Sequence, residues 1–181
     1  MSHGHGADHG GNKGIALLIS VLALVLAFSE TLGKSAQTLG LAYNIEASNL
    51  WAFFQAKTIR QTVLRTAAEQ ASVSPSSENS KKQVEKWLET AKRYQSEPET
   101  NEGRDELAKR AKEAETKRDR AMAAYHHYEL ASAAVQIAIV MASASIITSM
   151  AALVWIAGGL GVVGIVFCAI GFFFPTAVHL F

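Results

Sequence analysis

Residues 130–178 read "LASAAVQIAIVMASASIITSMAALVWIAGGLGVVGIVFCAIGFFFPTAV", and none of them is Asp, Glu, Lys or Arg. One helix needs about 20 residues to cross the hydrocarbon core of a bilayer, so this run is long enough for two helices. Lipid cannot hydrogen-bond an open backbone, so the chain must reverse at a membrane interface. Trp155, Gly158 and Gly159 favour a turn, which predicts spans at 130–152 and 157–175.

A further apolar run, "GIALLISVLALVLAFSETLG", occupies residues 14–33. Its uncharged part ends at Phe28 and has the length of a signal-peptide apolar region, with Ala27 to Ser29 as an acceptable cleavage site. The run nevertheless covers the bilayer when its last residues, up to Leu32, reach the headgroups. We therefore favour an uncleaved first transmembrane helix over a signal peptide.

The segment between these runs, residues 34–129, is rich in charge and has helical spacing without strand-like alternation. In its first helix, apolar side chains recur at Leu50, Phe53, Phe54, Ile59, Val63 and Ala67. Ser80 and Gln83 form a capping box for a second helix, whose predicted buried stripe is Val84, Trp87, Leu88, Ala91 and Tyr94.

A third helix carries a heptad pattern that consists mainly of alanine: Leu107, Ala111, Ala114, Arg118, Ala121, Tyr125 and Tyr128. The same spacing continues into the next span through Val135, Ile139, Ala142 and Ile146, which predicts one continuous helix. We expect this seam to pack on the aromatic helix around Trp51 to Phe54. The predicted fold is all-α, with three transmembrane helices and a helical, coiled-coil-like extramembrane hairpin between the first and the second.

Two stretches carry a resemblance to a known family: "NIEASNLWAFFQAKTIRQT" at 44–62 and "YHHYELASAAVQIAIVMASASIIT" at 125–148. The chain resembles a family of bacterial integral membrane proteins, domain-of-unknown-function family 4337, over nearly its whole length. The resemblance implies this architecture and a multi-pass protein of the bacterial inner (cytoplasmic) membrane, and it implies no activity. The uncharged hairpin between the last two spans departs from relatives that carry basic residues there.

Charges near the first span indicate the orientation. Lys13 and the terminal amine precede it, whereas Glu30 and Lys34 cancel at its other end, which favours a cytoplasmic amino terminus and a periplasmic central domain. A basic cluster before the second span opposes this orientation: Lys117, Arg118 and Arg120. Long loops translocate largely regardless of charge, so we follow the first span.

Two groups of side chains are candidates for a metal or proton site. His3, His5 and His9 alternate in a tail, residues 1–13, that is rich in glycine and that we expect to be disordered, although such imidazoles can chelate copper, nickel or zinc. His126 and Glu129 share one helix face, and Glu30 ends the first span on the same side of the membrane. These last three side chains can meet as a cluster, or they can belong, with Tyr125, His127 and Tyr128, to an interfacial belt.

Small side chains form a stripe on each of the last two spans. The third span has Ala157, Gly161, Gly164, Cys168 and Gly171, and the second has Ala131, Ala138, Ala142, Ser145 and Ser149, with Gln136 as its strongly polar residue. Membrane helices associate where small residues let two backbones approach. The two stripes either pack on each other or leave one face for another chain, and we expect a surplus face, centred on Gly164, that binds a neighbour.

The composition also excludes several functions. A net charge of +1 is too small for a nucleic-acid binder, and one cysteine rules out an intrachain disulfide. No motif of a known enzyme class, cofactor or small-molecule substrate is evident, so we expect no catalysis and no cofactor. The favoured function is a non-catalytic scaffold or accessory subunit in the lipid bilayer that assembles with itself or with a larger membrane complex. The alternative is a small pore or an ion- or proton-handling oligomer lined by Gln136, Ser143, Ser145, Thr148 and Ser149.

Overall fold

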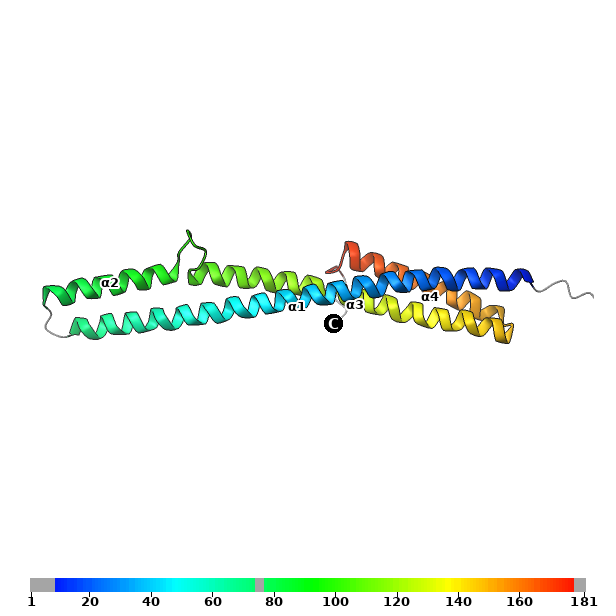
Figure 1. The fold of residues 1–181 in the computed structure, drawn as a ribbon, viewed down its shortest axis with the longest axis horizontal. Coiled ribbons are helices and arrows are strands. Elements are labelled where there is room, and N and C mark those ends of the chain that lie inside the picture. Colours follow the sequence, from blue (N-terminus) through cyan, green and yellow to red (C-terminus); the bar gives the residue numbers. More distant parts are fainter. Residues whose placement is uncertain (1–8, 74–76, 178–181) are drawn as a thin grey trace, which may run out of the picture. The chain divides into compact units, whose positions relative to one another are not determined.

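A computed structural model describes residues 9–73 and 77–177 of the chain. This part contains four helices and no strand: α1 (His9–Val73), α2 (Glu78–Gln95), α3 (Arg104–Thr148) and α4 (Ala151–Phe173), shown in Figure 1. The predicted all-α class is therefore confirmed. The prediction that the third charged helix continues into the second span is also confirmed, because α3 is one helix.

Three of these helices are long and apolar enough to cross a membrane, judged by their length and composition. They are α1 from Lys13 onward, α3 and α4. The predicted number of candidate spans is confirmed.

The chain divides into two compact units. Unit 1 comprises residues 1–40 and 119–181, and unit 2 comprises residues 41–118. Helices α1 and α3 contribute to both units, α2 belongs to unit 2, and α4 belongs to unit 1.

Unit 1 brings together α4, the first part of α1 and the last part of α3. Its buried centre consists of Leu22, Val135, Ala138, Ala142 and Ala157. Many large apolar side chains instead point outward, among them Leu17, Leu24, Val140, Val162 and Phe172. Helices that are apolar all round, with small residues at their contacts, are typical of a bundle whose surroundings are lipid.

The chain reverses between α3 and α4 at Ser149 and Met150, so the predicted turn at Trp155 to Gly159 is wrong. Ser149 has a φ of 54°, the left-handed conformation that often ends a helix. Helix length explains the position of the reversal. A helix of 23 residues is about 34 Å long and covers a hydrocarbon core of about 30 Å, whereas a helix starting near Ala157 and ending at Phe173 would be too short.

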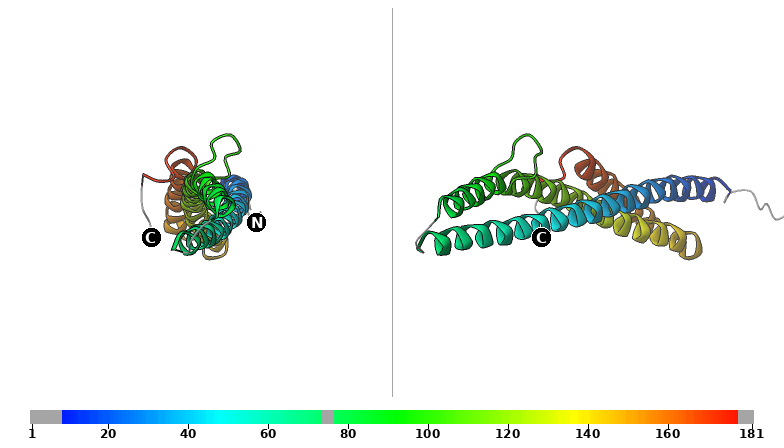
Figure 2. Two further views of the ribbon diagram at one scale, coloured as in Figure 1. Left: turned by 90° about the vertical axis from the view of Figure 1, so that its left-hand side faces the viewer. Right: turned by 60° about the vertical axis from the view of Figure 1, so that its left-hand side comes forward.

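Unit 2 is built by the rest of α1, by α2 and by the first part of α3. Figure 2 shows α2 running back beside the end of α1. A buried cluster joins α1 and α3, and its members are Ala47, Leu50, Leu107, Ala111 and Ala114, with Trp51 and Phe54 packed against it. The predicted contact between the alanine seam and the aromatic helix is confirmed.

Two details of α2 differ from the prediction. Its N-cap is Ser77, whose hydroxyl accepts a hydrogen bond from the Ser80 N–H at 3.3 Å, so Ser80 is inside the helix and is not its cap. Leu88 is 49% exposed, while Ala91 is the buried residue of the helix. Because α2 is packed mainly on α1, only a narrow face of it is covered.

Candidate functional site

Helix α1 buries one face throughout unit 2, and this face includes two polar residues. Its buried positions are Ala47, Leu50, Lys57, Gln61 and Ala68, separated by three, four or seven residues. Such spacing places them on one side of a helix. Lys57 and Gln61 therefore occupy core positions, where a charge or an amide needs partners.

Lys57 finds its partners on the chain that leaves α2. It is 5% exposed, and its Nζ lies 3.5 Å from Glu97 Oε2 and 4.0 Å from Glu102 Oε2. The same ammonium lies 5.4 Å from the ring centroids of Phe53 and Tyr94. Two carboxylates and two aromatic faces thus replace the water that burial removes.

Gln61 connects all three helices of unit 2. Its Nε2 donates to the Ala91 carbonyl at 2.9 Å and to Gln95 Oε1 at 3.1 Å. Arg104, the first residue of α3, donates from Nη1 to Gln61 Oε1 and to Gln95 Oε1. Its guanidinium also lies 4.9 Å above the ring of Phe54. We call Lys57, Gln61, Gln95, Glu97 and Arg104 the polar junction.

The loop between α2 and α3 is fixed beside this junction. The Ser96 hydroxyl donates to Glu106 Oε1 at 2.6 Å, and the Glu97 N–H donates to Glu106 Oε2 at 3.2 Å. The hydrogen bond from Ser96 is the main reason why the pKa of Glu106 is lowered. Gly103 is buried, and a Cβ there would overlap Glu106 and the backbone of the loop.

These contacts explain the motif between Trp51 and Lys57. Trp51 Nε1 donates to Glu115 Oε1 at 2.9 Å, and the Trp51 and Phe54 rings meet edge to face at 5.4 Å. The Phe54 ring packs against the guanidinium of Arg104, and the Lys57 ammonium binds the Glu97 carboxylate of the loop. The motif therefore holds α1 to α3 and to the loop. Its distinctive side chains, Trp51, Phe54 and Lys57, make their contacts within this chain.

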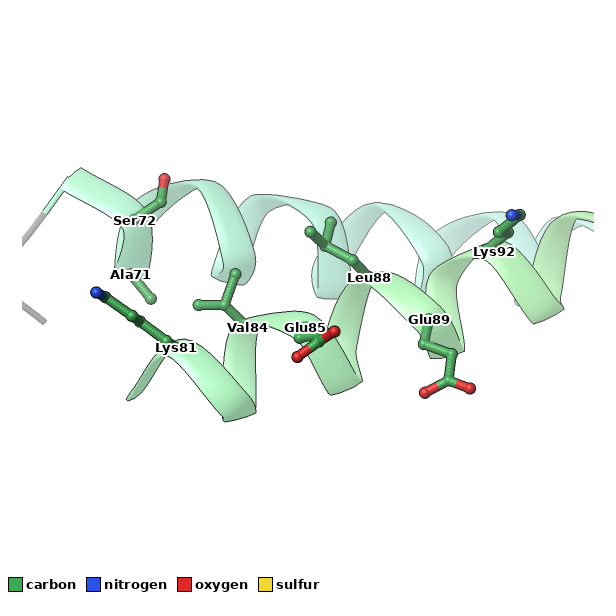
Figure 3. Close-up of a pocket in the computed structure, with 8 residues that line it drawn as sticks. All are labelled: Ala71, Ser72, Lys81, Val84, Glu85, Leu88, Glu89 and Lys92. Carbon is green, nitrogen blue, oxygen red and sulfur yellow. The ribbon is translucent and has the colours of Figure 1, made fainter. Parts of the chain in front are cut away.

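A groove lies between the ends of α1 and α2, with a volume of about 560 Å³. Its lining residues are Ala71, Ser72, Lys81, Val84, Glu85, Leu88, Glu89 and Lys92. Figure 3 shows Val84 and Leu88 on the side of α2 that faces α1, with charged side chains around them. The groove thus combines an apolar floor with a rim of both charges, and its floor includes Val84 and Leu88, which the sequence had placed on the buried stripe of α2.

The small residues of α4 lie inside unit 1. Ala157, Gly161, Gly164 and Gly171 are buried, and Cys168 is half-buried with its Sγ 3.0 Å from Ser29 Oγ. A Cβ at Gly161 would lie 2.6 Å from Leu22 Cδ2, and one at Gly164 would overlap Val135. The stripe is therefore covered by α1 and α3 of the same chain, which is the internal-packing alternative that the sequence left open.

The predicted small residues of α3 are divided between two environments. Ala138, Ala142 and Ser145 are buried in unit 1, and the Ser145 hydroxyl donates to the Ala142 carbonyl at 2.6 Å. Gln136 is exposed, and its Nε2 donates to Glu30 Oε1 at 3.3 Å.

The predicted cluster of Glu30, His126 and Glu129 is not formed. His126 Nδ1 lies 3.7 Å from Glu129 Oε2, and Glu30 contacts Gln136 instead. Gln136 is seven residues beyond Glu129, about 10 Å further along α3, so the two carboxylates lie at different levels. Within residues 9–73 and 77–177, no three His, Cys, Asp or Glu side chains are close enough to hold a metal ion.

Two members of the expected interfacial belt are buried between helices. His127 is 1% exposed, its Nε2 lies 3.3 Å from the Pro175 carbonyl oxygen, and its ring stacks on Phe167. Tyr128 is also buried, and it packs where Gly33 and Gly171 leave room. Both side chains pack inside unit 1, and His127 Nδ1 is buried without a hydrogen-bond partner among the described residues. His3 and His5 lie outside the described residues, as does the side chain of His9.

The fold and the contacts define an all-helical protein with three candidate membrane spans and a helical unit held by a buried polar junction. The chain belongs to the family described as Domain of unknown function (DUF4337), whose model matches residues 11–174. The match includes both units, from the first candidate span to the end of α4. Neither the curated proteins nor the solved structures contain a match to the chain.

Proposed function

We propose that the protein is a non-catalytic membrane scaffold or accessory subunit. In this proposal unit 1 anchors the chain in the bilayer, and unit 2 offers the hairpin of α1 and α2 to another protein. The observation that carries the proposal is the contrast within the hairpin. Its base is fixed by the polar junction, whereas its tip has an open groove in which Leu88 is 49% exposed.

Exposed apolar side chains are common singly, but Ala71, Val84 and Leu88 line one concave surface. Leu88 contributes to the groove and is half-exposed, and Lys81 and Glu85 provide charge at its rim. An apolar centre with a polar rim is the usual composition of a protein interface. We therefore assign the groove and its surroundings to a protein partner, either a larger membrane complex or another copy.

We also propose that the protein is not an enzyme and needs no cofactor. The polar side chains of the junction contact one another: Lys57 is bound by two carboxylates, and Gln61 by Ala91, Gln95 and Arg104. Side chains engaged in this way stabilise a fold, and apart from Arg104 Nε, a buried donor without a hydrogen-bond partner among the described residues, they leave little hydrogen-bonding capacity for a substrate.

The pore alternative has weaker support. The hydroxyls of Ser143 and Thr148 donate to Ile139 and Ala144, the carbonyls one turn earlier in α3, and Ser145 donates to Ala142. Their donors are already used by the helix, so they offer less to an ion than the sequence pattern indicated.

The test places a photo-crosslinking amino acid at position 88 in the groove or, as a control, at exposed Glu113 on α3. The proposal expects one defined protein adduct in native membranes from position 88 and none from position 113. The variant Val84→Lys, which places a charge in the groove, should abolish that adduct without loss of the membrane-inserted protein. Equal adducts from both positions, or none from position 88, would reject the hairpin as the binding surface.

A further inference from the structure

A polar pair lies on the outer surface of unit 1, between α1 and α3. Glu30 and Gln136 are both exposed, and they are joined by the hydrogen bond from Gln136 Nε2 to Glu30 Oε1 at 3.3 Å. Near the pair, the exposed residues of the two helices include the apolar side chains Leu24, Phe28, Ile137 and Val140.

The depth of this pair follows from contacts between helices. Ser29, the neighbour of Glu30, contacts Cys168 on α4, and α4 continues without charge for five more residues to Phe173. That distance is about 7.5 Å along a helix. On α3, Gln136 is about 10 Å beyond Glu129, the last charged residue before the uncharged run. The pair therefore lies within the apolar zone of the candidate spans.

The pair has hydrogen-bonding capacity that its own chain does not use. Among the described residues, neither the second N–H of Gln136 nor Glu30 Oε2 makes a hydrogen bond. Lys34, one turn further along α1, forms no ion pair with Glu30 within the described part of the chain. Lipid chains offer neither donors nor acceptors, and polar groups in lipid are costly unless they are paired.

The surface beside the pair allows another helix to come close. Ala16, Ser20, Ala23 and Ala27 precede Glu30 at alternating separations of four and three residues, and all are exposed. The Ser20 hydroxyl donates to the Ala16 carbonyl at 2.9 Å and is therefore held against its own helix. Small side chains in such a line permit close backbone approach in membranes.

We propose that a second copy of this chain covers this surface, with the two copies related by a two-fold axis along the membrane normal. Copies inserted in the same direction place Glu30 and Gln136 at the same depth. The pair contains both a donor and an acceptor, so it is complementary to itself under a two-fold rotation. Gln136 of each copy donates its second N–H to Glu30 of the other copy, and the stripe from Ala16 to Ala27 forms the close contact. This interface rests on the membrane insertion in the proposed function and is separate from the hairpin groove.

Disulfide cross-linking in native membranes tests the geometry. In a Cys168→Ser background, Ala27→Cys should give a product of twice the monomer mass after oxidation with iodine. Val166→Cys is the matched control, because Val166 is exposed on α4 and lies two residues from the level of Ser29. The proposal expects no cross-link from position 166. It is overturned if position 166 cross-links as well as position 27, or if position 27 gives no product or a product of another mass.

Polar variants then test the hydrogen bonds. Glu30→Leu should weaken the dimer about tenfold, as expected for the loss of paired interhelical hydrogen bonds. Glu30→Gln should retain it because an amide can both donate and accept. Glu129→Leu, which removes a carboxylate outside the pair, should leave the Ala27→Cys cross-link unchanged. Equal yields from Glu30→Leu and Glu129→Leu would overturn the proposal. Adducts from position 88 report on the groove independently, so failure of one surface does not imply failure of the other.

Discussion

Replacing Gly164 by alanine tests whether α4 packs inside its own chain. A Cβ at this position would overlap Val135 Cγ2 and would lie 3.2 Å from the Ala131 carbonyl oxygen. Val135 is fully buried, and as a β-branched residue it has one strongly preferred rotamer in a helix. The Ala131 oxygen belongs to the backbone of α3. Neither neighbour can move alone, so the substitution must separate α3 from α4.

Two opposing effects determine the size of the change. Overpacking a close contact costs about 1–3 kcal/mol, while alanine is favoured over glycine in a helix by about 1 kcal/mol. Gly159 lies on the same helix with no atom within 4 Å of an added Cβ. Gly159→Ala therefore gains the helix preference of alanine without the overpacking cost. The difference between the two variants therefore isolates the packing cost. We expect Gly164→Ala to be less stable than Gly159→Ala by about 1–3 kcal/mol.

Gly161 provides an intermediate case. A Cβ there meets Leu22 Cδ2 at 2.6 Å, the end of a side chain that can rotate, so Gly161→Ala should fall between the other two. Unfolding of the purified protein in mild detergent by added dodecyl sulfate, followed by circular dichroism, gives the three stabilities. If Gly164→Ala is as stable as Gly159→Ala, α3 and α4 are not in contact there, and the glycine face would again be free for another chain.

The remaining predictions concern unit 2. Ala114→Lys should destabilise it by about 2–4 kcal/mol, seen as faster limited proteolysis, because Ala114 is buried in the α1–α3 cluster. Trp51→Phe should cost about 1 kcal/mol in thermal unfolding by removing the hydrogen bond to Glu115. The lowered pKa of Glu106 means that its contribution is present above its unfolded pKa and is lost as the pH falls through its lower folded pKa. Glu106→Gln should therefore reduce the loss of stability on acidification below about pH 4.5. The same loss of stability in the variant and in the native protein would contradict this role of Glu106.

The sequence predicted the helices and candidate spans because their signals are long and repeated. An uncharged run of this length has few structural solutions, and the alanine seam of α3 recurs over several heptads. The reversal at Ser149 was missed because serine is a weak turn signal beside Gly158 and Gly159. Those glycines lie in α4, where an added Cβ would meet no other part of the chain within 4 Å, so glycine content alone did not identify the turn.

The buried face of α1 was misread for a different reason. Apolar periodicity placed Ile59 and Val63 toward the core, yet they are 65% and 60% exposed. Lys57 and Gln61 lie inside instead, because partners from α2 and the following loop satisfy them. A single-helix pattern ranks residues by their own polarity and contains no information about partners that lie 30 or more residues away in the sequence. The groove was missed for the same reason, since it needs the positions of two helices.

The polar junction explains how an alanine-rich unit selects one arrangement. Alanine seams fit together in several registers, because successive heptads present nearly the same surface. Shifting α3, which carries the alanine seam, along α1 by one heptad would take Arg104 away from Gln61 and Glu115 away from Trp51. A shift of α2 would likewise separate Gln95 and the Ala91 carbonyl from Gln61, and Glu97 from Lys57. A buried ammonium and a buried amide would then lose their partners, which costs far more than moving one alanine to the place of another. We infer that these polar residues fix the register of the hairpin, and through it the position of the groove that Val84 and Leu88 form against Ala71.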